Sequence, residues 1–111
     1  MTRDPGFEQQ LLDDLGHPQG ITPRAMFGGL CYMLNGHMLA AAREGRAMYR
    51  VGADADARAL TLPGTERMTQ TNRSMPGYIW LSEPGLSDDV IRSQLAQMAL
   101  AHVSTLPPKD R

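Results

Sequence analysis

The sequence is poor in cysteine, lysine and aromatic residues, and it has no long apolar run. Its single cysteine, Cys31, excludes an internal disulfide and a cysteine-rich metal framework. Eleven basic and twelve acidic residues leave a formal charge of −1, so the overall charge favours neither nucleic acid nor an anionic membrane as a partner. Because about 18 consecutive apolar residues never occur and no apolar segment follows a basic start, we expect neither a membrane span nor an export signal. A cytoplasmic location is the expectation that follows.

The chain has the length and apolar content of one compact domain. Its 111 residues, of which 41% are hydrophobic, suffice for a single buried core. No internal repeat, linker or low-complexity tract divides them. We therefore predict one domain over residues 1–111, with an ordered core over about residues 4–106 and a C-terminal tail over residues 107–111.

Helices are predicted at both ends of the domain. Near the N-terminus, Phe7 and Leu15 share an apolar stripe behind Asp4, which can act as the N-cap. Residues 17–24 hold two prolines and a glycine, which predicts a connector without regular structure. A last helix is predicted to begin at Ser87 as N-cap and to run to about residue 104.

Five strands and a short helix are predicted between these two helices. Asn35-Gly36 is a strong signal for a two-residue hairpin turn, and Glu44-Gly45 is predicted to form a second one. The expected strands cover residues 30–34, 38–43, 47–51, 65–70 and 77–82, with the short helix over residues 54–60. The order α-β-β-β-α-β-β-α predicts a two-layer α+β fold, in which helices cover a five-stranded antiparallel sheet.

Two-residue turns at both hairpins would fix which side chains share a face of the sheet. One face would be free of charge and covered by helices; it would hold Cys31, Met33, Met38, Ala40, Ala42, Ala47, Tyr49 and Val51. The opposite face would mix apolar side chains with arginines; it would hold Leu30, Tyr32, Leu34, His37, Leu39, Ala41, Arg43, Arg46, Met48 and Arg50. Aromatic, methionine and arginine side chains are enriched at protein interfaces. We therefore predict an interaction face made by Tyr32, Leu39, Arg43, Arg46, Met48 and Arg50. The alternative is that the last helix or the second pair of strands covers this face.

No constellation of residues indicates catalysis, a cofactor or a metal. The glycines of Phe27-Gly28-Gly29 lead into a strand and lack the spacing of a phosphate loop, so they are expected to permit a turn or a close backbone approach. The three histidines have no ligand spacing among them. Cys31 is expected on an apolar face, where a thiol is not activated. The seven internal methionines are expected to fill an adaptable core.

Nucleic-acid binding is the second hypothesis considered. The arginines at positions 43, 46, 50, 67 and 73, with Tyr78 and Trp80 near the last two in sequence, could form a basic and aromatic platform. A single lysine and a balanced net charge weigh against this hypothesis.

The segment from Arg24 to Gly36, RAMFGGLCYMLNG, resembles the opening of proteins of the TfoX/Sxy N-terminal-domain family. Further similar segments are Met38-Leu39, Arg50-Val51-Gly52, Met75 with Gly77-Tyr78, and residues 105–109, so the resemblance covers about residues 4–109. It implies a two-layer α+β domain similar to small secretion chaperones. Longer relatives regulate natural competence and carry a further C-terminal domain. The matched residues look structural, and the motif consists of Met26, Phe27, Gly28, Gly29, Asn35 and Gly36, with Met26 and Phe27 expected in the core.

We therefore expect a non-enzymatic, cytoplasmic bacterial protein that acts as an interaction or regulatory module without a cofactor. Its expected partner is another protein or a second copy of itself, with nucleic acid as the alternative and no membrane.

Overall fold

The computed structural model describes residues 4–26 and 28–108. In this part of the chain, a six-stranded antiparallel sheet is combined with three α-helices and two short 3-10 turns. In chain order, the elements are α1 (Pro5–Leu15), β1 (Ile21–Met26), β2 (Gly29–Leu34), β3 (His37–Arg43), β4 (Arg46–Arg50), η1 (Ala53–Ala55), α2 (Asp56–Ala59), β5 (Thr65–Gln70), β6 (Arg73–Leu81), η2 (Gly85–Ser87) and α3 (Asp89–Val103).

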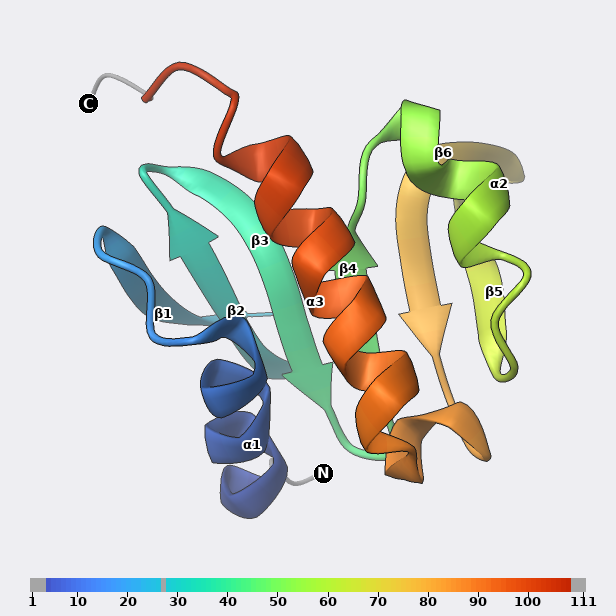
Figure 1. Ribbon diagram of the computed structural model, residues 1–111, viewed down its shortest axis with the longest axis horizontal. Coiled ribbons are helices and arrows are strands. Elements are labelled where there is room, and N and C mark those ends of the chain that lie inside the picture. The colour runs from blue at the N-terminus through green and yellow to red at the C-terminus, as the bar shows by residue number, and fades with distance from the viewer. Residues whose placement is uncertain (1–3, 27, 109–111) are drawn as a thin grey trace.

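The three helices lie on the same side of the sheet, whose strand order is β1-β2-β3-β4-β6-β5 (Figure 1). Helix α3 contacts β3 and β4, α1 packs beside it against β3, and α2 lies against β6. The main core fills the space between the two layers, and its largest fully buried side chains are Tyr49, Leu11, Leu39, Ile79, Leu81, Leu95 and Val103. The α+β fold is therefore confirmed. No described helix covers the other side of the sheet, which we call the open face.

Local capping signals explain where the two long helices begin. The Asp4 side chain accepts a hydrogen bond from the backbone N–H of Phe7 at 3.1 Å, which confirms it as the N-cap of α1. In α3 the N-cap is Asp88 and not Ser87, because the Asp88 carboxylate accepts hydrogen bonds from the first turn of the helix. The Ser87 hydroxyl instead donates to the Glu83 carboxylate at 2.6 Å.

The prediction of five strands is wrong, because part of the expected connector forms β1. This strand pairs with β2 from Ile21 opposite Leu34 to Met26 opposite Gly29. It lies at the edge of the sheet, where Pro23 is tolerated and where four consecutive residues stay exposed. An exposed edge strand lacks the alternation of apolar and polar residues by which strands are recognised, so the sequence did not indicate it.

Both hairpin turns form as predicted. In the first hairpin, however, the strand register shifts by one residue a short distance from the turn. Leu34 pairs with His37 across Asn35-Gly36, and Arg43 pairs with Arg46 across Glu44-Gly45. Further along the first hairpin, Tyr32 pairs with Ala40 instead of Leu39. Leu39 is therefore an extra residue in β3, that is, a β-bulge.

The bulge reverses the predicted faces of β2 relative to those of β3 and β4. Ala40, Ala42, Ala47, Tyr49 and Val51 face the helices as expected. Leu30, Tyr32, Leu34 and Leu39 join them in the main core, whereas Cys31, Met33 and Met38 lie on the open face. One additional residue in a strand moves every later side chain to the other face, which explains the reversal.

Candidate functional site

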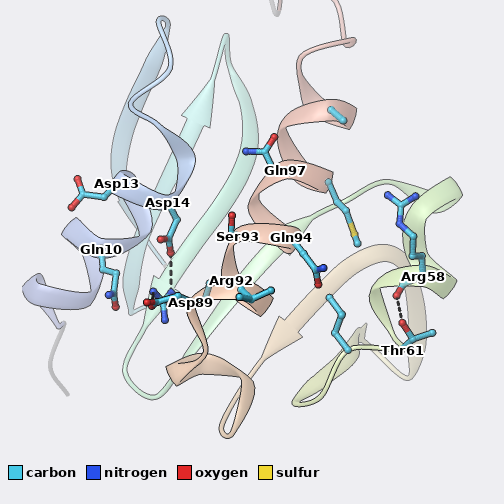
Figure 2. Close-up of a pocket in the computed structure, with 14 residues that line it drawn as sticks. Gln10, Asp13, Asp14, Arg58, Thr61, Asp89, Arg92, Ser93, Gln94 and Gln97 are labelled. Atoms are coloured by element: carbon cyan, nitrogen blue, oxygen red, sulfur yellow. Dashed lines mark hydrogen bonds and ion pairs between the residues drawn. The ribbon is translucent and has the colours of Figure 1, made fainter.

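The helix side of the molecule has a wide, shallow hollow of about 1300 Å³ between α1, α2 and α3 (Figure 2). Its labelled side chains are polar and come from all three helices and the turn after α2. The deepest is Arg92, whose side chain is 3% exposed. Its guanidinium donates to Asp14 at 2.9 Å, to Asp89, and to the backbone carbonyl of Leu86 at 3.0 Å.

These contacts make Arg92 a structural residue. Burial alone would lower its pKa, but the hydrogen bonds and charges of Asp14 and Asp89 outweigh burial and raise that pKa. Because Nε and both terminal nitrogens already have acceptors, the hollow presents no unpaired buried cation to a ligand. We therefore assign this hollow to the docking of α1 against α3.

A second hollow, of about 410 Å³, lies on the open face and is much more apolar. We call it the methionine groove. It is lined by Met26, Gly29, Cys31, Met38, Ala41, Arg43, Met48, Met68, Gln70, Met75, Tyr78 and Trp80. All six strands contribute to this lining: β4 supplies Met48, and the other five strands supply the rest.

The strand register explains how the groove is built. Cys31, Ala41, Met48 and Trp80 stand side by side in one row across β2, β3, β4 and β6. The first three are buried, although no helix covers them, because larger neighbours surround them. Cys31 on β2 and Ala41 on β3 have small side chains, so the surface of the sheet is lower at these two positions and forms the bottom of the groove.

The glycines of the predicted motif shape the edge of the groove. Gly28 has φ +76°, and a Cβ atom on Gly29 would lie 2.4 Å from the carbonyl oxygen of Ala42. The turn and the close approach expected of these glycines are therefore confirmed. Met26 packs on the open face and not in the main core, which corrects its expected place. Phe27 lies outside the described residues.

The methionines do not fill the main core, which corrects the expectation from composition. Of the seven internal methionines, six are on the open face: Met26, Met33, Met38, Met48, Met68 and Met75. Only Met98 packs on the helix-side core within the described residues. A cluster of this kind is recognisable only after the strands have been placed, because each of its six members comes from a different strand.

Arginines of β3 and β4 lie close to the aromatic side chains of the groove. The guanidinium of Arg46 lies 3.7 Å from the centre of the Trp80 ring and that of Arg43 lies 5.8 Å from it. Arg50 lies 5.5 Å from the centre of the Tyr78 ring. Within residues 4–26 and 28–108, none of these three guanidinium groups forms an ion pair. Their charge is therefore free to meet a partner.

The predicted interaction face is divided between the two sides of the sheet. Tyr32 and Leu39 are wrongly placed in it: both are buried in the main core, and the Tyr32 hydroxyl donates to the carbonyl of Glu8 at 2.7 Å. The other predicted members lie on the open face; they are Arg43, Arg46, Met48 and Arg50. Their role in binding stays a prediction. No local signal places Trp80, Tyr78 and the other four methionines of the groove on this face, because strand pairing and the bulge at Leu39 depend on contacts between distant segments.

The structure also divides the arginines of the nucleic-acid hypothesis. Arg67 lies on the helix side of the sheet, where it donates to the buried Asp56 carboxylate. The hydrogen bonds from Arg67 lower the pKa of Asp56, with a further contribution from the backbone N–H of Gly77, which donates at 2.8 Å. This carboxylate therefore connects α2 to β5 and β6, and Arg67 does not belong to the open face.

Two other buried groups are not activated for chemistry. Burial raises the pKa of the Cys31 thiol, so the thiol at the bottom of the groove stays neutral at pH 7. Burial also raises the pKa of Tyr49, and the nearby Asp14 carboxylate raises it further. In the part of the chain that the structure describes, no three His, Cys, Asp or Glu residues gather as metal ligands would. None of the described helices has the length and apolar character needed to cross a membrane.

The fold and the groove together define a small α+β domain with helices on one side of its sheet and a sulfur-rich hollow on the other. Residues 10–103 match the model of the TfoX N-terminal domain, so the chain belongs to the TfoX N-terminal domain family. No curated protein and no solved structure matches the chain. The expected likeness to secretion chaperones therefore stays a prediction.

Proposed function

We propose that this protein is a non-enzymatic interaction module of the bacterial cytoplasm, with a regulatory role, that binds another protein through the methionine groove. The observation that carries the proposal is the gathering of six methionines with Trp80 and Tyr78 on a sheet face that no described helix covers. An antiparallel sheet with one covered face ordinarily presents polar side chains on the other. A concentrated apolar patch at that position is typical of a binding surface.

The chemistry of the groove supports binding rather than catalysis. Its polar groups are the neutral Cys31 thiol, the Gln70 amide, the Arg43 guanidinium, the Tyr78 hydroxyl and the Trp80 indole N–H. A general base close to a nucleophile is needed for most covalent or acid-base mechanisms, and among the described residues no carboxylate or imidazole lines the groove to act as that base. Methionine side chains are flexible and polarisable, so they adapt to the surface of a protein partner.

Nucleic acid is the second candidate, and the arginines beside Trp80 are the observation in its favour. Base stacking would use the face of the Trp80 ring, which the Arg46 guanidinium already covers at 3.7 Å. Five of the twelve described lining residues are methionines, whose thioethers offer bases neither ring stacking nor strong hydrogen bonds. A protein partner is therefore the better match to this surface.

Methionine methyl groups provide a direct test. Protein labelled with ¹³C at the methionine methyl carbons would be titrated with bacterial protein fragments selected on the immobilised domain. We expect the fragments to shift the six open-face methyl signals and to leave that of Met98 on α3 unchanged. Fragments that shift Met98 alone would refute the proposal. DNA or RNA oligonucleotides that shift the groove signals, where no protein fragment does, would support the nucleic-acid alternative instead.

Matched substitutions complete this test. Met38 and Met98 are both half-buried, and they lie on opposite sides of the sheet. Met38→Glu is expected to abolish binding of the selected fragments, and Met98→Glu is expected to retain it. The opposite result would place the binding surface on the helix side.

A further inference from the structure

The groove is wide enough for one α-helix. Its lining residues run from Met26 on the edge strand β1 to Met68 and Gln70 on the other edge strand, β5. These strands are five steps apart in the sheet, which corresponds to roughly 24 Å between their backbones at ordinary strand spacing. The side chains at the two edges take up several ångströms of that width, and a helix with its side chains is about 10–12 Å across. One helix fits between the edges, and two do not.

The bottom of the groove suits the apolar stripe of such a helix. Gly29, Cys31 and Ala41 have small side chains or none, so the side chains of a partner can enter between the larger lining residues. The methionines around them can change rotamer at low cost and fit apolar side chains of different shapes. Amphipathic helices that bind in such grooves are a recurring mode of peptide recognition.

The charge of the side chains around the groove determines which sign of charge a partner must carry. By strand register, Arg24, Arg43, Arg46 and Arg50 share the open face, and Glu66 beside Trp80 is the one acidic residue placed there by the described strand pairs. The whole chain carries a formal charge of −1, so positive charge is concentrated on this face. Two copies placed with these faces together would bring arginines against arginines, which disfavours a second copy as the occupant.

The spacing of the arginines along β4 gives the spacing of the partner's carboxylates. Arg46 and Arg50 are four residues apart at the two ends of this strand, which corresponds to roughly 13 Å. In an α-helix, positions that share one side and span a similar length are about seven residues, or two turns, apart, which corresponds to roughly 10.5 Å. A helix packed along β4 would therefore meet both arginines with acidic residues about two turns apart, because the long arginine side chains can span the remaining roughly 3 Å.

We propose that the methionine groove binds a single amphipathic α-helix of another protein, with its apolar stripe in the groove and its carboxylates on Arg46 and Arg50. This inference rests on the proposed function and adds the conformation and the charge of the partner. It does not depend on which protein carries the helix.

Three synthetic 18-residue peptides test the inference. The first is an acidic amphipathic helix with leucine and methionine on one stripe and two glutamates along one border of that stripe, about seven residues apart. The second replaces the glutamates with lysines, and the third replaces two central residues with prolines, which break the helix. Each would be titrated into protein labelled at the methionine methyl carbons. We expect the acidic helix to shift the groove methyl signals and not that of Met98, and both other peptides to bind at least about ten-fold more weakly.

Charge reversal in the protein sharpens the test. Arg46→Glu and Arg50→Glu are each expected to weaken binding of the acidic peptide by roughly three- to ten-fold and to strengthen binding of the lysine peptide. Arg58→Glu, on the exposed surface of α2, is the matched control and is expected to leave both affinities unchanged. Two separate reversals keep the test decisive if Arg46, which rests on Trp80, is needed for folding.

The outcomes separate this inference from the proposed function. Groove signals that shift equally well with the proline peptide or the lysine peptide would overturn the helical, acidic partner and leave a protein-binding groove intact. If the acidic peptide does not bind, the inference is also overturned. The proposed function would still hold in that case if the selected protein fragments shift the groove signals. If neither the peptides nor the selected fragments shift those signals, both proposals fail.

Discussion

Asp14→Ala removes the partly buried carboxylate that holds the guanidinium of Arg92 between α1 and α3. The Arg92 side chain is 3% exposed and that of Asp14 is 16% exposed, whereas the second partner, Asp89, is 86% exposed. The two ion pairs share one guanidinium and differ mainly in their access to water. They should therefore differ strongly in what they contribute to stability.

The magnitudes follow from that difference in burial. Removing one partner of a buried ion pair typically costs about 3–5 kcal/mol, because the remaining charge loses its compensation. Arg92 keeps Asp89 and the carbonyl of Leu86, so we expect about 2–3 kcal/mol for Asp14→Ala. For the exposed Asp89, loss of a surface pair and of a favourable position at a helix N-terminus predicts less than about 1 kcal/mol.

Urea unfolding at pH 7, followed by circular dichroism, measures both free energies of unfolding. A double-mutant cycle with Arg92→Met supplies the control, since Asp14→Ala should cost much less once the buried charge is gone. Equal costs for Asp14→Ala and Asp89→Ala would refute the reasoning, and so would an undiminished cost of Asp14→Ala beside Arg92→Met. Either result would show that burial does not decide how much these two ion pairs contribute to stability.

Two further predictions concern groups on the helix side and near β6. Because Arg67 lowers the folded-state pKa of Asp56 below 3.8, the carboxylate stabilises the fold above about pH 4, and this contribution is lost as the pH falls through the folded-state pKa. The stability advantage of the wild type over Asp56→Asn should therefore be constant above about pH 5 and shrink in acid, as urea unfolding across that range would show; a pH-independent difference would contradict it. Gly52→Ala should destabilise by about 3 kcal/mol, because Gly52 has φ +88° and its Cβ would lie 2.5 Å from Nδ1 of His102. Gly45→Ala, at φ +82° with no atom within 4 Å of the added Cβ, is the matched control in thermal unfolding, and equal losses would show that the His102 contact is unimportant.

The arginines of the candidate site can be placed from the sequence, whereas its aromatic residues cannot. Arg43, Arg46, Met48 and Arg50 were placed together correctly, because they belong to one hairpin with a two-residue turn. Trp80 joins them from β6, a strand that begins only after η1, α2 and β5, and no local signal indicates that β6 pairs with β4. The composition of the groove therefore could not be predicted, although its positive charge could.

The sequence by itself determined the features that depend only on residues a few positions away in the chain. The N-cap of α1, the turn at Asn35-Gly36 and the second turn at Glu44-Gly45 all follow from local hydrogen bonds and allowed backbone angles.

Only the tertiary structure decided the edge strand β1, the bulge at Leu39, and hence which residues lie beneath the helices and which on the open face. Leu39 and Ala40 are both apolar, so no alternation of residue types marked the point where the register shifts by one. Strand pairing is set by hydrogen bonds and packing between distant segments, and a shift of a single residue exchanges the two faces of a sheet. For this reason Cys31 and Met33 lie on the open face, while Tyr32 and Leu39 lie in the main core.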